Sequence, residues 1–261
     1  MTTIFFCGPV TNPRFAWYPL QTTSQFFLSM KNLLFAALLV AAATAPAFAQ
    51  SSEVRTVPTF HAINVGTGIE LTLTAGHNQR VEVGADTPEL RDHILTTVEN
   101  GVLTLRYDNR DDRRGRQRLN KHLRASVTAD QLTALSAHSG SEVRASGDFD
   151  ADNFQLDVSS GASVKANLAT GTLAVRQSSG STAALRGHAT SLDVRSSSGA
   201  SFDGADLQTE RARAEASSGS SIQVAVKDDL VAEASSGGSI NYRGQPQLTK
   251  RTSSGGSVSG R

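Results

Sequence analysis

Apolar and polar residues alternate with a period of two along most of the chain from residue 59 onward. In the second half, these runs flank a recurring Ser-Gly phrase. An apolar residue stands three positions after each phrase's glycine, and apolar pairs such as Leu173 and Val175 stand seven and five positions before it. Alternation of this kind is typical of a strand with one buried face. The pattern therefore predicts repeated strand–turn–strand units from Ser139 to Arg261.

The repeated unit has a nearly constant length. The marker glycines step by 18–21 residues, and they are Gly140, Gly161, Gly180, Gly199, Gly219, Gly237 and Gly255. Such a period is the signature of a solenoid. One unit cannot bury its apolar face alone, but stacked units can pair strand on strand at a spacing of about 4.8 Å. We predict an all-β fold, a parallel β-helix or β-solenoid with coils of 18–21 residues.

A disordered Gly/Ser linker is the alternative interpretation of this composition. We do not favour it, because a linker would not keep apolar residues in phase over seven repeats.

The segment before the repeats also alternates, for example at Ile69, Leu71 and Leu73. Asn100-Gly101 is typical of a hairpin turn. Thr87 followed by Pro88 predicts one helical turn with Thr87 as its N-cap. We expect residues 59–136 to form opening coils or a small sheet, an N-terminal β cap over the stack.

The N-terminus has the pattern of an export signal. From Met30, a basic Lys31 precedes an apolar run, and Ala47-Phe48-Ala49 is a small-x-small cleavage site. We therefore divide the chain into residues 1–29, an upstream extension that is not translated; 30–49, a secretory signal peptide; 50–58, a flexible leader; and 59–261, a single β-solenoid domain. The apolar run is too short to span a bilayer, so we expect no membrane span in the mature protein.

Removal of residues 1–49 changes the charge and thiol content. It takes away Cys7, Arg14 and Lys31, which leaves no cysteine and 23 basic (25 − 2) against 24 acidic residues. A chain without cysteine suits an oxidising compartment, and a neutral balance gives no argument for nucleic acid as a partner. We expect export to the periplasm, the cell surface or the extracellular space.

One segment is strongly basic. Its candidate residues for an anionic ligand are Arg110, Arg113, Arg114, Arg116, Arg118 and Lys121. The functional interpretation is contact with an anionic partner such as an acidic glycan, and the alternative, which we favour, is a solvated loop between two strands.

A second candidate set stands four residues before successive marker glycines. These residues are Asp157, Arg176, Arg195, Glu215, Glu233 and Arg251. Stacking in register would align them as one outward row. Glu215 and Glu233 would then lie at roughly 5 Å, near the separation that retaining glycosidases use, so a polysaccharide-active lyase or hydrolase is the alternative function. Because any exposed strand face carries polar residues, we favour a solvated face.

Other chemistry is not indicated. The six histidines are scattered without the spacing of metal ligands, and the serines lack a catalytic context. We therefore expect no catalytic, cofactor-binding or metal-binding residues. After Val258 only three residues follow, so we expect an uncapped last coil through which a homodimer forms or a partner docks.

Two stretches together resemble a known family. Phe60–Val65 leads into Ile69–Leu73, and Leu132-Thr133-Ala134-Leu135 leads into the serial Ser-Gly phrases. Over roughly residues 60–258 this order resembles the family of unknown function described as "putative auto-transporter adhesin, head GIN domain". The resemblance implies a secreted bacterial protein with a right-handed parallel β-helix and no established reaction. We expect a non-catalytic binding, adhesion or scaffold protein of the cell envelope, whose partner is a glycan, an envelope component or a protein.

Overall fold

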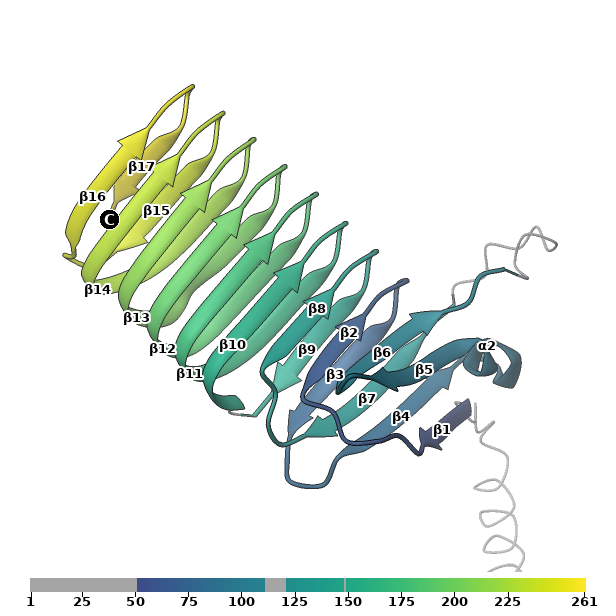
Figure 1. Cartoon of the computed structure of the whole chain (residues 1–261). Helices are drawn as coiled ribbons and strands as arrows, with labels where there is room; N and C mark the ends of the chain where they lie inside the picture. The colour runs from purple at the N-terminus through teal and green to yellow at the C-terminus, as the bar shows by residue number, and fades with distance from the viewer. Residues whose placement is uncertain (1–50, 111–120, 148) are drawn as a thin grey trace, which may run out of the picture. The chain divides into compact units, whose positions relative to one another are not determined.

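The structure is a computed structural model that describes residues 51–110, 121–147 and 149–261. The expected upstream extension, the signal peptide and its cleavage site at Ala47 and Ala49 lie outside the described residues. The regular secondary structure of the described chain is nearly all β, and it forms a parallel β-solenoid, which confirms the predicted fold class (Figure 1).

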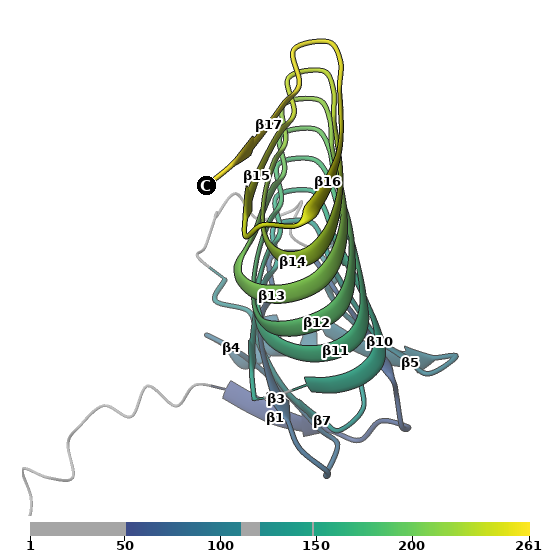
Figure 2. The ribbon, with the colours of Figure 1, turned by 90° about the vertical axis from the view of Figure 1, so that its left-hand side faces the viewer.

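Five strands form the regular part of the stack. They are β10 (Phe149–Val158), β11 (Ser163–Gln177), β12 (Thr182–Ser196), β13 (Ser201–Ala216) and β14 (Ser221–Ala234). Each pairs in parallel with the next. The strands β11 to β14 are long because each runs through a rounded corner and so contributes to two facing sheets. Figure 2 shows the tight turns at the top of the stack and the rounded corners below.

Shorter strands continue the stack at both ends. The coil before β10 consists of β8 (Ala134–Ala137) and β9 (Glu142–Ser146). The last coils contain β15 (Ser239–Arg243), β16 (Gln247–Thr252) and β17 (Ser257–Gly260). Parallel pairing continues through all of them.

The N-terminal cap combines opening coils with antiparallel strands. Its coil strands are β2 (Ala62–Val65), β3 (Glu70–Ala75), β6 (Val102–Tyr107) and β7 (Arg124–Ala129). The strand β2 lies between β6 and β8, so the first coil in the sequence is the second in space. The strand β4 (Arg80–Ala85) pairs antiparallel with β7, and β5 (Ile94–Glu99) pairs antiparallel with β6. Both predicted forms of the cap are therefore present.

Two local predictions for this region have different outcomes. Thr87 caps the short helix α2 (Pro88–Asp92), and its hydroxyl accepts a hydrogen bond from the Leu90 N–H at 3.3 Å, as predicted. The prediction of a flexible leader is wrong for the residues of β1 (Ser51–Arg55), because this strand pairs antiparallel with β4. A strand forms there because β4 offers a free edge whose backbone groups need partners.

The core is a column of small and branched apolar side chains between the two sheets. The residues three positions after the marker glycines are all buried, from Val143 and Val164 to Ile240 and Val258. Phe202 is the bulkiest of them and is 0% exposed. Two polar residues, Gln177 and Ser196, also face inward and are buried. The alternation read from the sequence therefore identifies the inward face correctly.

Each tight turn has the same backbone geometry. The turn serines have φ between +47° and +55°, and the glycines that follow have φ between +68° and +76°. Two positive φ values in succession are typical of the type I′ turn. The N–H of each glycine from Gly140 to Gly237 donates to the serine carbonyl of the next coil at 3.0–3.2 Å. The hydrogen-bonded ladder therefore runs through the main chain.

The last coil differs from the others on its inward side. Lys250 is in register with Ala232, an inward position of the preceding coil, and its Nζ donates to the carbonyl oxygen of Val258 at 2.9 Å. An inward-pointing charge is one way in which proteins blunt a strand edge against pairing. The expected homodimer through this coil stays a prediction, and Lys250 opposes it.

Candidate functional site

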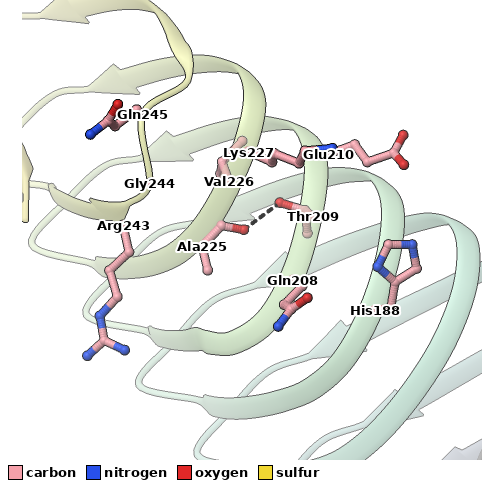
Figure 3. Close-up of a pocket in the computed structure, with 10 residues that line it drawn as sticks. All are labelled: His188, Gln208, Thr209, Glu210, Ala225, Val226, Lys227, Arg243, Gly244 and Gln245. Carbon is pink, nitrogen blue, oxygen red and sulfur yellow. Dashed lines mark hydrogen bonds between the residues drawn. The ribbon is translucent and has the colours of Figure 1, made fainter.

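The main candidate site is a groove on the rounded corners, opposite the tight turns. The glycine-to-glycine step falls from 20 residues (199 to 219) to 18 (219 to 237). The pairing of β13 with β14 consequently jumps from Gly204–Val224 to Gln208–Ala225. The corner contracts at this point and leaves a groove of about 640 Å³. Its lining residues are His188, Gln208, Thr209, Glu210, Ala225, Val226, Lys227, Arg243, Gly244 and Gln245 (Figure 3).

One small side chain deepens the depression. Strand register aligns His188, Gln208, Ala225 and Arg243 in one column along the stack. Ala225 is the only short side chain among them, and Figure 3 shows it between Gln208 and Arg243. We call this depression and its walls the corner groove.

The floor of the corner groove is shaped by close contacts to two main-chain carbonyl groups. The Thr209 hydroxyl donates to the Ala225 carbonyl at 2.8 Å, and both Thr209 and Val226 are buried. Gly244 has φ +109°, and a Cβ there would overlap the carbonyl oxygen of Val226. Glycine is therefore required where the chain passes close to the floor.

The walls carry more positive than negative charge. Lys227 and Arg243 oppose one carboxylate, Glu210, so the lining has a net charge of +1 (2 − 1) with His188 neutral. The ion pair of Lys227 with Asp228 is long, at 4.0 Å. Arg243 makes no ion pair with any residue that the structure describes. Both cations are therefore available to an anionic ligand, together with the amides of Gln208 and Gln245.

The outward row forms a single column, as the sequence predicts. Its members, Asp157, Arg176, Arg195, Glu215, Glu233 and Arg251, are paired in register from β10 to β16. Shallow grooves of about 450 and 240 Å³ run beside the two halves of the column. Serines, among them Ser178 and Ser235, line their other side.

The two carboxylates of the enzymatic alternative are bridged by an arginine. The Arg213 guanidinium lies 2.7 Å from Glu215 and 3.3 Å from Glu233. Its hydrogen bond to Glu215 raises the pKa of Arg213 above its usual value. Both carboxylates are therefore already paired with one guanidinium, whereas the two carboxyl groups of a glycosidase flank the scissile bond. This geometry does not favour glycoside hydrolysis.

The basic segment is described only at its ends. Arg113, Arg114, Arg116 and Arg118 lie outside the described residues. Arg110 lies 2.7 Å from Asp108, and hydrogen bonds from Arg110 lower the pKa of Asp108 to about 2. The Lys121 ammonium lies over the Tyr107 ring, 4.4 Å from its centroid. Both described ends therefore contact residues of their own segment.

Two of the histidines each pair with one acid. His77 lies 3.1 Å from Asp130, which raises the pKa of His77, and His122 lies 2.7 Å from Asp86. Within the part of the chain that the structure describes, no three His, Cys, Asp or Glu side chains come together in a group that could hold a metal. No helix among those same residues has the length and hydropathy needed to cross a bilayer.

Fold and surface define a class: an elongated parallel β-solenoid with charged and hydroxyl-rich outer faces. Within that class, the chain belongs to the family described as "putative auto-transporter adhesin, head GIN domain", which matches residues 59–246. The predicted resemblance is thus confirmed. No curated protein matches the chain.

Solved structures share the fold at low sequence identity. A "putative adhesin" from Bacteroides fragilis has a TM-score of 0.70 at 18% identity, covering 81% of this chain and 96% of its own. A "putative adhesin" from Parabacteroides merdae has a TM-score of 0.64 at 17% identity, covering 81% and 95%. A "putative lipid binding protein" from Parabacteroides distasonis has a TM-score of 0.58 at 15% identity, covering 81% and 96%. At these identities the likeness extends to the fold alone.

Sequence reasoning missed the corner groove. The signal was present in the shortened step between Gly219 and Gly237, and in the small Ala225 between two long side chains. Charged residues can be recognised directly in a sequence, so the outward row was predicted. A contraction of the backbone is not marked by any one residue type.

Proposed function

We propose that this protein is an exported, non-catalytic binding protein of the bacterial cell envelope, with an adhesion or scaffold role. We further propose that the corner groove holds an acidic segment of an envelope or surface glycan. The observation that carries the proposal is the pair of available cations, Lys227 and Arg243, on the walls around Ala225.

The dimensions of the corner groove support an extended ligand. Its lining comes from four successive coils, from His188 on β12 to Arg243 on β15. Four coils span about 14 Å, or three steps of about 4.8 Å. A stretch of two or three sugar units fits this length, with its carboxylate or sulfate near the cations and its hydroxyls near the amides of Gln208 and Gln245.

The cellular location is supported by the signal pattern of residues 30–49 and by the adhesin description of the family. The periplasm and the outer surface both suit an elongated protein without cysteine in its mature form.

The polysaccharide-active enzyme remains the second candidate and is tested with the same reagents. Glu215 and Glu233 do stand in register on neighbouring strands. A screen of acidic polysaccharides should reveal no depolymerisation by the wild type. Cleavage that disappears in a Glu215→Gln variant would establish the enzyme instead.

The direct experiment is a glycan array followed by affinity chromatography on the retained acidic glycan. We expect the double variant Lys227→Ala/Arg243→Ala to bind at least about tenfold more weakly, since it removes both cations of the corner groove. Lys165→Ala is the matched control, because Lys165 is an exposed cation of β11 that does not line this groove. Equal loss in the control, or no loss in the double variant, would reject the corner groove as the binding site.

A further inference from the structure

The outward face of the second half of each coil carries two columns of side chains. The column nearer the tight turns is the outward row already described, Asp157, Arg176, Arg195, Glu215, Glu233 and Arg251. The second column stands two residues earlier on the same strands. Its members are Gln155, Ala174, Asp193, Arg213, Val231 and Thr249.

When the order of the coils is reversed, each charge in these columns meets the opposite charge. From β10 to β16 the first column carries the signs −, +, +, −, −, +. Read backwards, every sign is replaced by its opposite. The second column behaves in the same way: Asp193 exchanges with Arg213, and apolar Ala174 exchanges with apolar Val231. In both columns, the centre about which the charges reverse lies between β12 and β13.

This symmetry has a direct geometric meaning. A two-fold axis parallel to the strands, midway between β12 and β13, turns a second copy face to face with the first. It reverses the order of the coils and leaves each column opposite itself. Arg195 then faces the second copy's Glu215, Arg176 faces Glu233, and Asp157 faces Arg251. An interface with one patch on both subunits is the isologous kind that dimers use.

We infer that this face is a homodimer interface, occupied by a second, antiparallel copy of the chain. The side chains are already held in place by ion pairs within one copy. Arg195 lies 3.2 Å from Asp193 and 3.6 Å from Glu215, and Arg251 lies 3.6 Å from Glu233. Such pre-ordering lowers the entropic cost of forming an interface.

The area is sufficient for a specific dimer. Six coils at about 4.8 Å and seven strand residues at about 3.3 Å give a face of roughly 650 Å² per copy. The total of about 1,300 Å² exceeds the roughly 1,000 Å² expected of a biological interface. The next aligned positions toward the N-terminal cap are uncharged, Ser136 and Asn64, so the charged pattern ends where the symmetric stretch ends.

The proposed dimer also places both corner grooves on the same edge. A two-fold axis parallel to the strands keeps strand direction, so the rounded corners of both copies lie along the same edge of the dimer. Two grooves on one edge allow a polymeric ligand to bind bivalently, which raises the apparent affinity without new contacts.

The experiment is analytical ultracentrifugation of the mature chain and two charge-reversal variants. We expect the wild type to form a dimer that weakens as salt increases, because exposed charges are screened beyond about 10 Å at 0.1 M salt. Arg195→Glu and Glu215→Arg should each weaken self-association at least about tenfold, since symmetry turns each change into two like-charge contacts. A mixture of the two variants should dimerise again, because one contact then joins the two substituted residues with opposite charges and the other contact keeps the native pair of Arg195 and Glu215.

A matched control separates this face from charge changes in general. Arg186→Glu makes the same change on the same strand and breaks a similar ion pair, Arg186 to Asp206 at 3.5 Å, but on the other half of the coil. It should dimerise like the wild type. A monomeric wild type, a dimer unaffected by Arg195→Glu, or a mixture that stays monomeric would each overturn the inference.

Discussion

The tight turns and the rounded corners lie at opposite edges of the same coils and differ in almost every respect. At the turns, a serine and a glycine with positive φ recur with nearly constant angles, and one main-chain hydrogen bond joins each coil to the next. At the corners, the number of residues changes from coil to coil and the pairing slips. The regular edge holds the stack in register, which leaves the irregular edge free to vary and to form a binding site.

The charged face stands between these extremes. Its strands keep register in the half-coils from Arg176 to Arg251, and its charges follow the reversible order on which the proposed dimer depends. A regular backbone places these charges at even spacing, and the order of the charges makes the face self-complementary.

The largest difference between the two edges should appear when a glycine becomes alanine. Gly187→Ala, at a corner, combines φ +106° with a Cβ that overlaps the Leu168 carbonyl. We expect a loss of about 2–6 kcal/mol in the free energy of unfolding, from backbone strain and overpacking together. Gly180→Ala at a turn has positive φ but nothing within 4 Å of the new Cβ, so its cost should be only about 1–2 kcal/mol. Urea unfolding measures both, and equal losses would contradict the account.

An acidic substitution at the corner should weaken ligand binding, whereas an acidic substitution at the turns should leave it unchanged. Ala225→Glu places a carboxylate between Gln208 and Arg243 and should weaken retention on an acidic glycan at least about tenfold. Ser198→Glu adds the same charge to an exposed turn residue and should leave retention unchanged. A stronger effect at Ser198 would move the binding site to the turns.

The basic segment offers a test of the competing site. Replacing Arg113, Arg114, Arg116 and Arg118 by serine should alter heparin retention less than the Lys227→Ala/Arg243→Ala change does, if that segment is a solvated connector. A larger loss in the serine variant would make the basic segment the principal anionic site.

The strain at the turns predicts a small stabilisation. Ser179 holds φ +55°, which costs an ordinary L-residue about 1–2 kcal/mol, and asparagine adopts this region more readily. Ser179→Asn should therefore raise the free energy of unfolding by up to about 1 kcal/mol. Ser163→Asn, on strand β11, should bring no gain because asparagine is disfavoured in strands.

The smallest effect concerns pH at the N-terminal cap. Asp130 raises the pKa of His77 in the folded protein. The stabilisation from this pair is fully present below the unfolded pKa of about 6.5 and is lost as pH rises through the folded pKa. NMR titration should show a lower pKa for His77 in Asp130→Asn, and an unchanged value would mean that the contact does not form in solution.

The sequence predicts the fold because its signals are local and repeated. Inward residues such as Val164 and Phe202, the turn glycines and the Thr87 cap each follow from alternation, spacing or residue type. The order β6–β2–β8 and the strand β1 do not follow, because both depend on which free edge a distant segment covers. The corner groove was not predicted for a related reason, because it arises from the difference in length between two coils and not from a motif in either coil.

The central claim is that the irregular corner, and not the regular turn edge, binds the ligand. A crystal structure of the mature chain with the acidic oligosaccharide that it retains most strongly tests this directly. The account predicts the sugar over Ala225, with its anionic group within hydrogen-bonding distance of Arg243 or Lys227. A sugar bound along the turn serines from Ser160 to Ser254, with the corner empty, would contradict it.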